Sequence, residues 1–219
     1  MPSLWSQIEL DQVWDNDFKV RYLKTDKWKA TVSFGKRADI KRLTGGTDDD
    51  NNSRLDFDFA EIKHELTYEI DKQYDIGLET RFRYKTLFTD ETENEIRVSP
   101  YVIYSNSKNK VENSYELKVE FRRFQDSFKY RVRLGHESEK PFASQVEKDN
   151  PLKWFYGTTV LSQFEGDERT EIELRNHLGI DVSLWKRTSA SLAVQLRSEY
   201  DFDDIAFSLF YKTALGYKF

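Results

Sequence analysis

The chain has 219 residues, of which 38% are apolar, 33% are charged and 15% are aromatic, and its formal net charge at pH 7 is −5. The aromatic content excludes a disordered chain, because disordered segments are poor in aromatic residues. The negative charge argues against a nucleic-acid-binding protein, and no run of about 18 apolar residues exists to form a transmembrane helix. The absence of cysteine excludes disulfides, thiolate metal ligands and cysteine nucleophiles.

Apolar and polar residues alternate with a period of two along most of the chain, which predicts β-strands. In chain order, the clearest segments are 74–88, 115–122, 128–134, 171–185 and 205–219. Clusters of turn-favouring residues separate the segments. They lie at 15–17, 25–27, 44–53, 71–73, 89–94, 105–110, 125–127, 138–150, 165–168, 186–188 and 201–204. These breaks delimit about twelve strands, within a range of 10–12, and no change in composition marks a domain boundary.

Alternation leaves open which face of the strands is buried. A soluble barrel or sandwich buries the apolar face, whereas an outer-membrane barrel turns that face toward lipid and its charged face toward a lumen. The segments are roughly 9–15 residues long, which is enough for a tilted strand to cross a bilayer. Aromatic residues such as Trp28, Trp154 and Trp185 recur near segment ends, as interfacial girdles require.

We therefore expect an all-β fold: a single closed antiparallel transmembrane β-barrel of about twelve strands, formed by residues 1–219 as one domain. The expected location is the outer membrane. Because patterned sequence begins directly after Met1, the leader peptide of such an exported protein would already have been removed.

The connections also differ in charge between the two ends of the expected barrel. With the C-terminus on the periplasmic side, the external connections begin with DND at 15–17 and TGGTDDDNNS at 44–53 and end with DFDD at 201–204, and all are acidic. Asp and Asn favour turns in any protein, which is a second explanation for this asymmetry. Segment 138–150 is long for a periplasmic connection, where short turns are expected.

The C-terminal sequence FSLFYKTALGYKF resembles the terminal strand of Gram-negative outer-membrane barrels, with Leu215, Tyr217 and Phe219 on one face. The whole chain resembles small barrels such as the acidic-oligosaccharide porins for oligogalacturonate and sialic acid. It also resembles an uncharacterised outer-membrane family, through LWSQIELDQVW near the start and RNHLGIDVSLWKRTSASLAVQLRSEYD near the end. The resemblance implies that Leu215, Tyr217 and Phe219 close the barrel and form the signal for the barrel-assembly machinery.

Basic residues on the polar face of segments 74–137 are the candidates for a lumen wall that sets selectivity. They are Arg81, Arg83, Lys85, Arg97, Lys118, Arg122, Lys129, Arg131 and Arg133. Guanidinium groups bind carboxylates bidentately and keep their charge, so this wall suits the passage of anions. Glutamates such as Glu79, Glu95 and Glu120 interrupt it. The alternative is therefore that the charges pair across strands and fill the interior.

One motif suggests an enzyme. His136, Ser138 and Asn150 locally resemble the outer-membrane phospholipase A family, in which a serine beside a histidine base performs acyl transfer. However, the topology places the motif at the wrong membrane face, and the rest of that family's sequence pattern is missing.

The expected function is a passive porin-like channel for small solutes, including anions and oligosaccharides. The alternatives are a non-conducting structural or partner-binding barrel, and a lipid hydrolase that uses Ser138 and His136. The expected partners are outer-membrane lipid, the barrel-assembly machinery and small solutes. We expect neither a cofactor nor a metal site.

Overall fold

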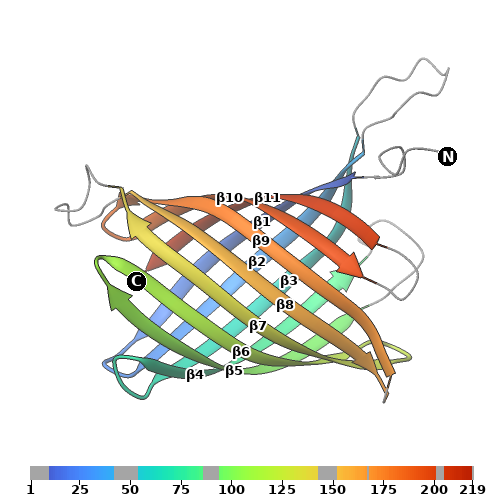
Figure 1. The fold of residues 1–219 in the computed structure, drawn as a ribbon, viewed down its shortest axis with the longest axis horizontal. Helices are drawn as coiled ribbons and strands as arrows, with labels where there is room; N and C mark the ends of the chain where they lie inside the picture. Colours follow the sequence, from blue (N-terminus) through green and yellow to red (C-terminus); the bar gives the residue numbers. More distant parts are fainter. Residues whose placement is uncertain are drawn as a thin grey trace.

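The computed structural model of the protein describes residues 10–41, 54–85, 94–142, 152–166, 168–200 and 205–218. These residues form eleven β-strands in one closed barrel (Figure 1). The strands are β1 (Leu10–Lys24), β2 (Trp28–Lys41), β3 (Arg54–Glu69), β4 (Tyr74–Lys85), β5 (Glu95–Lys108), β6 (Val111–Arg123), β7 (Phe128–Pro141), β8 (Lys153–Glu165), β9 (Glu168–Trp185), β10 (Thr188–Tyr200) and β11 (Ile205–Lys218). Among the described residues, none belongs to a helix long and apolar enough to cross a membrane.

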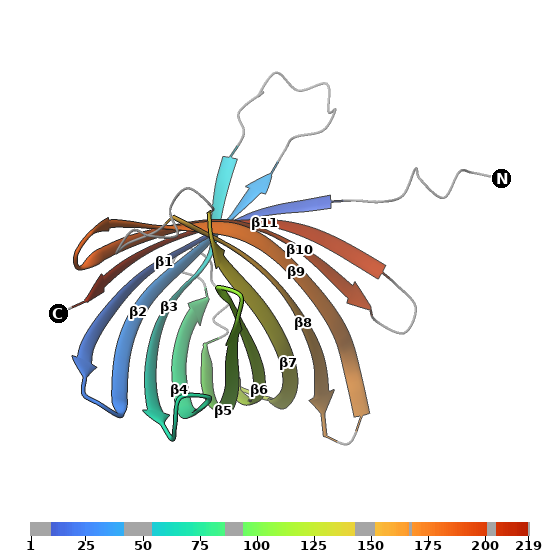
Figure 2. The same ribbon diagram turned by 60° about the vertical axis from the view of Figure 1, so that its left-hand side comes forward.

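The strands follow one another around the wall in chain order, and each pairs antiparallel with the next (Figure 2). The barrel closes where β1 pairs with β11, from Leu10 opposite Phe207 to Arg21 opposite Lys218, and this pair is parallel. The expectation of a closed all-β barrel with 10–12 strands is confirmed. The closing pair departs from the antiparallel pairing expected throughout, because an odd number of strands brings the first and the last into the same direction.

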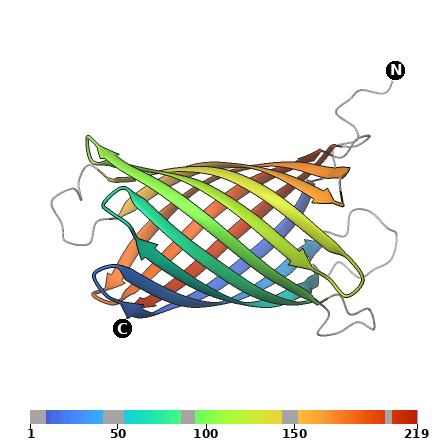
Figure 3. The same cartoon turned by 90° about the horizontal axis from the view of Figure 1, so that it is seen from below.

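We name the two ends of the barrel by the direction of β11. Both β1 and β11 run toward what we call the C-terminal end, and both begin at the opposite end (Figure 3). The strand directions place the β2–β3, β4–β5, β6–β7, β8–β9 and β10–β11 connections at the opposite end. The acidic sequences TGGTDDDNNS, TDETEN, QDS, EGDE and DFDD lie in or next to these connections.

The prediction of a turn at 15–17 is wrong, and this accounts for the count of eleven strands instead of twelve. Asp15, Asn16 and Asp17 lie inside β1 and pair with both neighbouring strands. The Asp15 side chain is held by an ion pair to Arg37 on β2, and Asn16 accepts a hydrogen bond from the Thr213 hydroxyl on β11. These cross-strand contacts outweigh the local turn preference of Asp and Asn.

Two other predicted connections are shorter than expected. Residues 105–108 belong to β5, and the chain reverses at Asn109 and Lys110, whose φ angles of 54° and 64° are typical of a two-residue hairpin turn. Residues 138–141 belong to β7, while 143–150 lie outside the described residues. The long connection at the C-terminal end is therefore shorter than 138–150.

The outer face of the barrel is apolar and the inner face is polar. Large apolar side chains on the outer face of β4–β7 are between 39% and 59% exposed, namely Ile76, Leu78, Phe82, Ile96, Val98, Leu117, Phe121 and Leu134. The buried residues include many charged side chains, of which Glu95, Glu120 and Glu173 are at most 1% exposed. This distribution is the reverse of that in soluble proteins, where charged residues are almost never fully buried.

Candidate functional site: a charged barrel lumen

A cavity of about 920 Å³ occupies the interior of the barrel. All eleven strands contribute to its lining, because alternate residues of every strand point inward. It extends from Lys129 and Glu199, near the opposite end, to Glu137, near the C-terminal end. Among the described residues that line it, fourteen are Lys or Arg and eight are Asp or Glu.

The structure brings most of the basic residues expected in the lumen onto one wall, formed by β4–β7. Arg81, Arg83, Arg97, Arg122, Lys129, Arg131 and Arg133 line the cavity. Lys118 is buried in the same wall, where its ammonium group contacts Glu79 and Glu116 at 3.3 Å. Lys85 ends β4, and its side chain lies outside the described part of the structure.

Glu95 on β5 is the centre of the densest ion-pair cluster in this wall. Its Oε1 atom accepts hydrogen bonds at 2.7 Å from Arg97 and from Arg122, and Arg83 lies 3.6 Å from its Oε2 atom. The carboxylate is 1% exposed. Three guanidinium groups from three strands thus surround one carboxylate, and these ion pairs connect β4, β5 and β6.

Neighbouring glutamates extend the cluster. Glu61 on β3 contacts Arg81 at 3.2 Å and Arg83 at 2.9 Å, and Glu120 on β6 contacts Arg97 at 3.2 Å and Arg133 at 2.7 Å. The basic wall is therefore an alternating network of cations and carboxylates. Removing one member leaves its partners buried without a counter-charge, which is strongly destabilising.

Gln163 on β8 links the network to the next sector of the barrel. Its Oε1 atom accepts hydrogen bonds from Arg122 and, at 2.9 Å, from Arg131. Its amide nitrogen donates to Glu171 on β9 at 3.1 Å. One neutral side chain thereby connects two guanidinium groups to a carboxylate across four strands.

Two phenylalanines inside the barrel support arginines, and the sequence analysis did not assign them a role. The Arg37 guanidinium lies 4.6 Å from the Phe59 ring centre and 4.9 Å from the Phe210 ring centre. Arg83 lies 3.8 Å from the Phe59 ring centre, and Arg197 lies 3.7 Å from the Phe210 ring centre. Such cation–π contacts are favourable where water is partly excluded. A sequence signal existed, because Phe210 lies between the outward-facing Leu209 and Tyr211 and so falls on the polar face of its strand.

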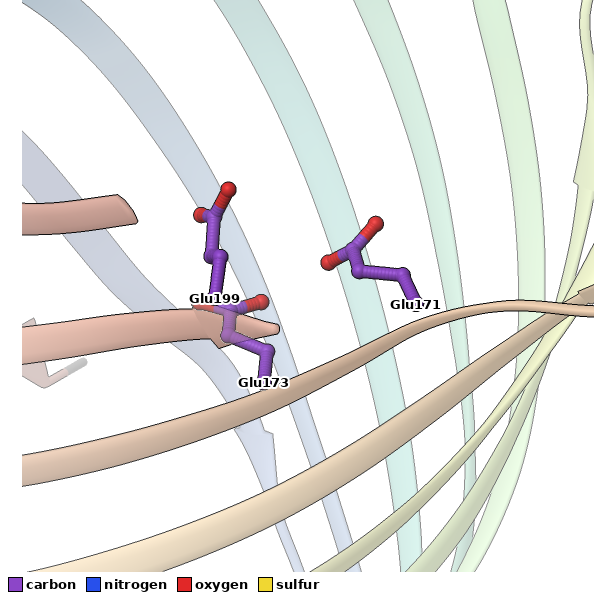
Figure 4. A group of neighbouring side chains, drawn as sticks. All are labelled: Glu171, Glu173 and Glu199. Carbon is purple, nitrogen blue, oxygen red and sulfur yellow. The ribbon is translucent and has the colours of Figure 1, made fainter. Parts of the chain in front are cut away.

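Glu171, Glu173 and Glu199 form a cluster on β9 and β10 in which one oxygen of each lies within 4.8 Å of the others (Figure 4). Glu173 is held by Arg175 at 2.6 Å and by Arg197 at 2.9 Å. Two guanidinium groups thus occupy the central carboxylate, so this cluster continues the ion-pair network of the wall.

A second cavity of about 330 Å³ lies at the C-terminal end, between the β3–β4 and β5–β6 turns and the end of β7. Glu137 lines both this mouth cavity and the main cavity. Its Oε2 atom lies 3.0 Å from Nε2 of His177 on β9. The His177 ring packs against Gly157, where a Cβ atom would come within 2.4 Å of the ring. The Glu137–His177 pair therefore lies at the junction of the two cavities.

The serine and histidine of the hydrolase hypothesis lie together on the outer side of β7, in phase with Leu134. Ser138 Oγ is 3.3 Å from His136 Nε2, but it donates a hydrogen bond to Asn113 Oδ1 at 2.7 Å. Asn150 lies outside the described residues. The structure thus places Asn113, which the sequence analysis did not consider, beside the hydroxyl.

The residues expected to close the barrel lie at the end of β11. Leu215 is 51% exposed on the outer face, and Tyr217 has the same phase. Phe219 lies outside the described residues. The strand itself closes the barrel by pairing with β1.

No family model, no curated protein and no solved structure matches this chain.

Proposed function

We propose that the protein is an outer-membrane β-barrel that acts as a passive channel for small anionic solutes. The observation that carries the proposal is the combination of an apolar outer face with a charged, hollow interior. A closed barrel satisfies all backbone hydrogen bonds within its wall, which is the condition for crossing lipid with strands.

The outer face supports the membrane location. Soluble monomers seldom expose contiguous apolar patches larger than a few hundred Å², whereas apolar side chains cover the outside of this barrel on successive strands. A protein with this surface would aggregate in water, and lipid removes that liability.

A row of aromatic rings near the C-terminal end supports the same location. Trp28 and Tyr68 lie 4.8 Å apart between ring centres, Tyr74 and Tyr104 lie 5.1 Å apart, and Tyr104 and Tyr115 lie 6.1 Å apart. These residues span the outer ends of β2–β6. Rings with a polar atom favour the membrane–water interface, so this row is suited to be one of the two girdles of a membrane barrel.

The charge of the lumen supports anions as the solutes. The fourteen cations that line the main cavity exceed its eight carboxylates by six. Three buried carboxylates of the wall, Glu79, Glu95 and Glu120, and one buried cation, Lys118, reduce the excess to four. The chain as a whole carries a net charge of −5. The lumen is thus positive although the chain as a whole is negative, and low-dielectric walls concentrate its field.

Reconstitution into planar lipid bilayers tests the proposal. We expect discrete conductance steps and, in a KCl gradient, a reversal potential on the anion side that shrinks as salt rises, because the Debye length falls from about 8 Å at 0.15 M to about 3 Å at 1 M. A correctly folded protein that adds no conductance would exclude the channel.

A non-conducting structural or partner-binding barrel is the alternative that one specific observation favours. The ion-pair network around Glu95 and Glu120 crosses the wall from β3 to β8 and gives the interior a rigid filling. Exclusion of anions as small as chloride would support this alternative.

Lipid hydrolysis by Ser138 is less favoured, because the hydroxyl donates to Asn113 and not to His136. Phospholipase activity that is lost on Ser138→Ala would revive it.

A further inference from the structure

We propose that two lysines, Lys63 and Lys212, set the anion preference of the lumen, whereas the arginines of the β4–β7 wall are structural. This inference rests on the proposed channel function. It differs from the expectation drawn from the sequence, in which those arginines tune selectivity.

Lys63 on β3 lines the main cavity, and no carboxylate lies within ion-pairing distance of it among the described residues. The carboxylates around it have other partners, since Glu61 binds Arg81 and Arg83, and Glu79 binds Arg81 and Lys118. Asp17, which also attracts Lys63, contacts Lys19 at 3.5 Å. The residue opposite Lys63 on β2 is Ser33, which is neutral. The Lys63 ammonium therefore lines the cavity without a carboxylate in contact with it among the described residues.

Lys212 on β11 is in the same situation on the other side of the closing seam. Its neighbour in register on β1 is Asp15, and its neighbour on β10 is Ala193. Both oxygens of Asp15 accept hydrogen bonds from Arg37, at 2.7 Å and 3.1 Å. Within the described part of the chain, Lys212 makes no ion pair, and it too lines the main cavity.

The arginines of the β4–β7 wall are paired with carboxylates, which explains why the two lysines affect the anion preference more. An arginine in contact with a carboxylate presents a dipole whose potential falls steeply with distance, whereas the charge of an unpaired ammonium is not offset by a carboxylate in contact with it. Arg97, for example, lies between Glu95 and Glu120 at 2.7 Å and 3.2 Å. A solute in the lumen therefore experiences the two lysines more strongly than the more numerous arginines.

The size of the lining residues also favours the part of the lumen near Lys63 and Lys212. Small residues line the cavity near these lysines, namely Gly35 on β2, Ser191 and Ala193 on β10 and Ala214 on β11. The β4–β7 wall carries long, paired side chains instead. We infer that water and solute have the most room beside β10, β11, β1 and β2, the sector that contains Lys212 and borders Lys63 on β3.

The test compares Lys63→Gln, Lys212→Gln and the double variant with the parent protein in planar bilayers under a KCl gradient. A unit charge about 8 Å from an ion in water changes the local concentration of that ion about twofold. Because anions and cations change in opposite directions, we expect each substitution to lower the chloride-to-potassium permeability ratio about fourfold. Lys63→Arg and Lys212→Arg should keep the parent ratio.

Lys118→Gln is the matched control. Lys118 is a buried lysine of the β4–β7 wall that is paired with two glutamates and does not line the main cavity. We expect Lys118→Gln to lower thermal stability and to leave the permeability ratio of the channels that fold unchanged.

The outcomes separate the inference from the proposed function. A parent protein that folds and does not conduct removes the channel, and the inference with it. A conducting parent whose ratio is the same in the double glutamine variant overturns the inference alone. A Lys63→Gln or Lys212→Gln protein that fails to fold also overturns it, because that lysine would then belong to the structural network.

Discussion

Asp15 of β1 and Arg37 of β2 form a two-point ion pair inside the barrel, with Nε of Arg37 2.7 Å from Oδ1 and Nη2 3.1 Å from Oδ2. The pair lies next to the closing seam, since Asp15 is also opposite Lys212 of β11. Arg37 in turn stacks on Phe59 and Phe210. This contact anchors the first strand to its neighbours at the point where the barrel closes.

Replacing Asp15 by Ala should therefore destabilise the barrel. The change leaves the Arg37 guanidinium, 16% exposed, with only a 3.9 Å contact to Asp58 among the described residues, and we expect a loss of about 3 kcal/mol in the free energy of unfolding. Urea titration of the detergent-folded protein measures this loss. Asp17→Ala is the control, because the one ion pair of Asp17 within the described residues is a 3.5 Å contact with the exposed Lys19, and this variant should lose less than about 1 kcal/mol. Equal losses for the two variants would contradict the role of the pair.

The Asp15–Arg37 pair also shows which part of the fold the sequence alone does not predict. The alternation in 128–134 and 205–219 predicts strands because it depends only on local order, and β7 and β11 confirm it. The segment Asp15–Asp17 has the composition of a turn, and only its partners on β2 and β11 keep it extended. Such partners are distant in sequence, so the turn prediction was wrong and the parallel closing pair could not be foreseen.

For the lumen, alternation predicts which side chains share a face but not which charges contact each other. The inward position of Arg81, Arg83 and Arg131 follows from their phase in the strand. The pairing of Glu95 with three arginines depends on the register of β4, β5 and β6, which local pattern does not give. The unpaired state of Lys63 and Lys212 depends on the same register.

Glu95→Gln should weaken the wall of the barrel. Glu95 is 1% exposed and accepts 2.7 Å hydrogen bonds from Arg97 and Arg122. Its neutralisation leaves the buried Arg122 without a carboxylate partner among the described residues. We expect a loss of about 3 kcal/mol or more in the free energy of unfolding. Glu116→Gln should cost less than half as much, because this glutamate is more exposed and, among the described residues, forms an ion pair with Lys118 alone. A Glu95→Gln barrel as stable as the parent would mean that water screens the cluster.

The proposed membrane location predicts how the protein folds. The purified chain should fold only in detergent or lipid and should migrate differently on gels before and after heating, because the apolar outer face requires a lipid-like solvent. Trp185, which is 71% exposed, should show a blue shift in fluorescence on transfer from urea to detergent. A stable, soluble monomer in plain buffer would rule out the membrane location.

Deleting Phe219 should impair assembly in cells. If Leu215, Tyr217 and Phe219 form the terminal signal, the deletion lowers the amount of heat-modifiable protein in the outer-membrane fraction several-fold, although it removes only one ring. Phe207→Ala is the control, because Phe207 lies at the other end of the same strand. The deletion variant should still fold in detergent, which separates assembly from stability. Normal outer-membrane levels of the deletion variant would disprove the signal.

His177→Ala should widen the passage between the two cavities. The His177 ring lies over Gly157 and its Nε2 atom is 3.0 Å from Glu137, the one described residue that lines both cavities. Removing the ring empties space at this junction, so we expect single-channel conductance to rise about twofold while the barrel still folds. His64→Ala is the control, because His64 lies on the outer side, 2.6 Å from the Tyr22 hydroxyl, and should not change conductance. If His177→Ala conducts like the parent, the narrowest part of the passage lies elsewhere, within the arginine and glutamate network of β4–β7.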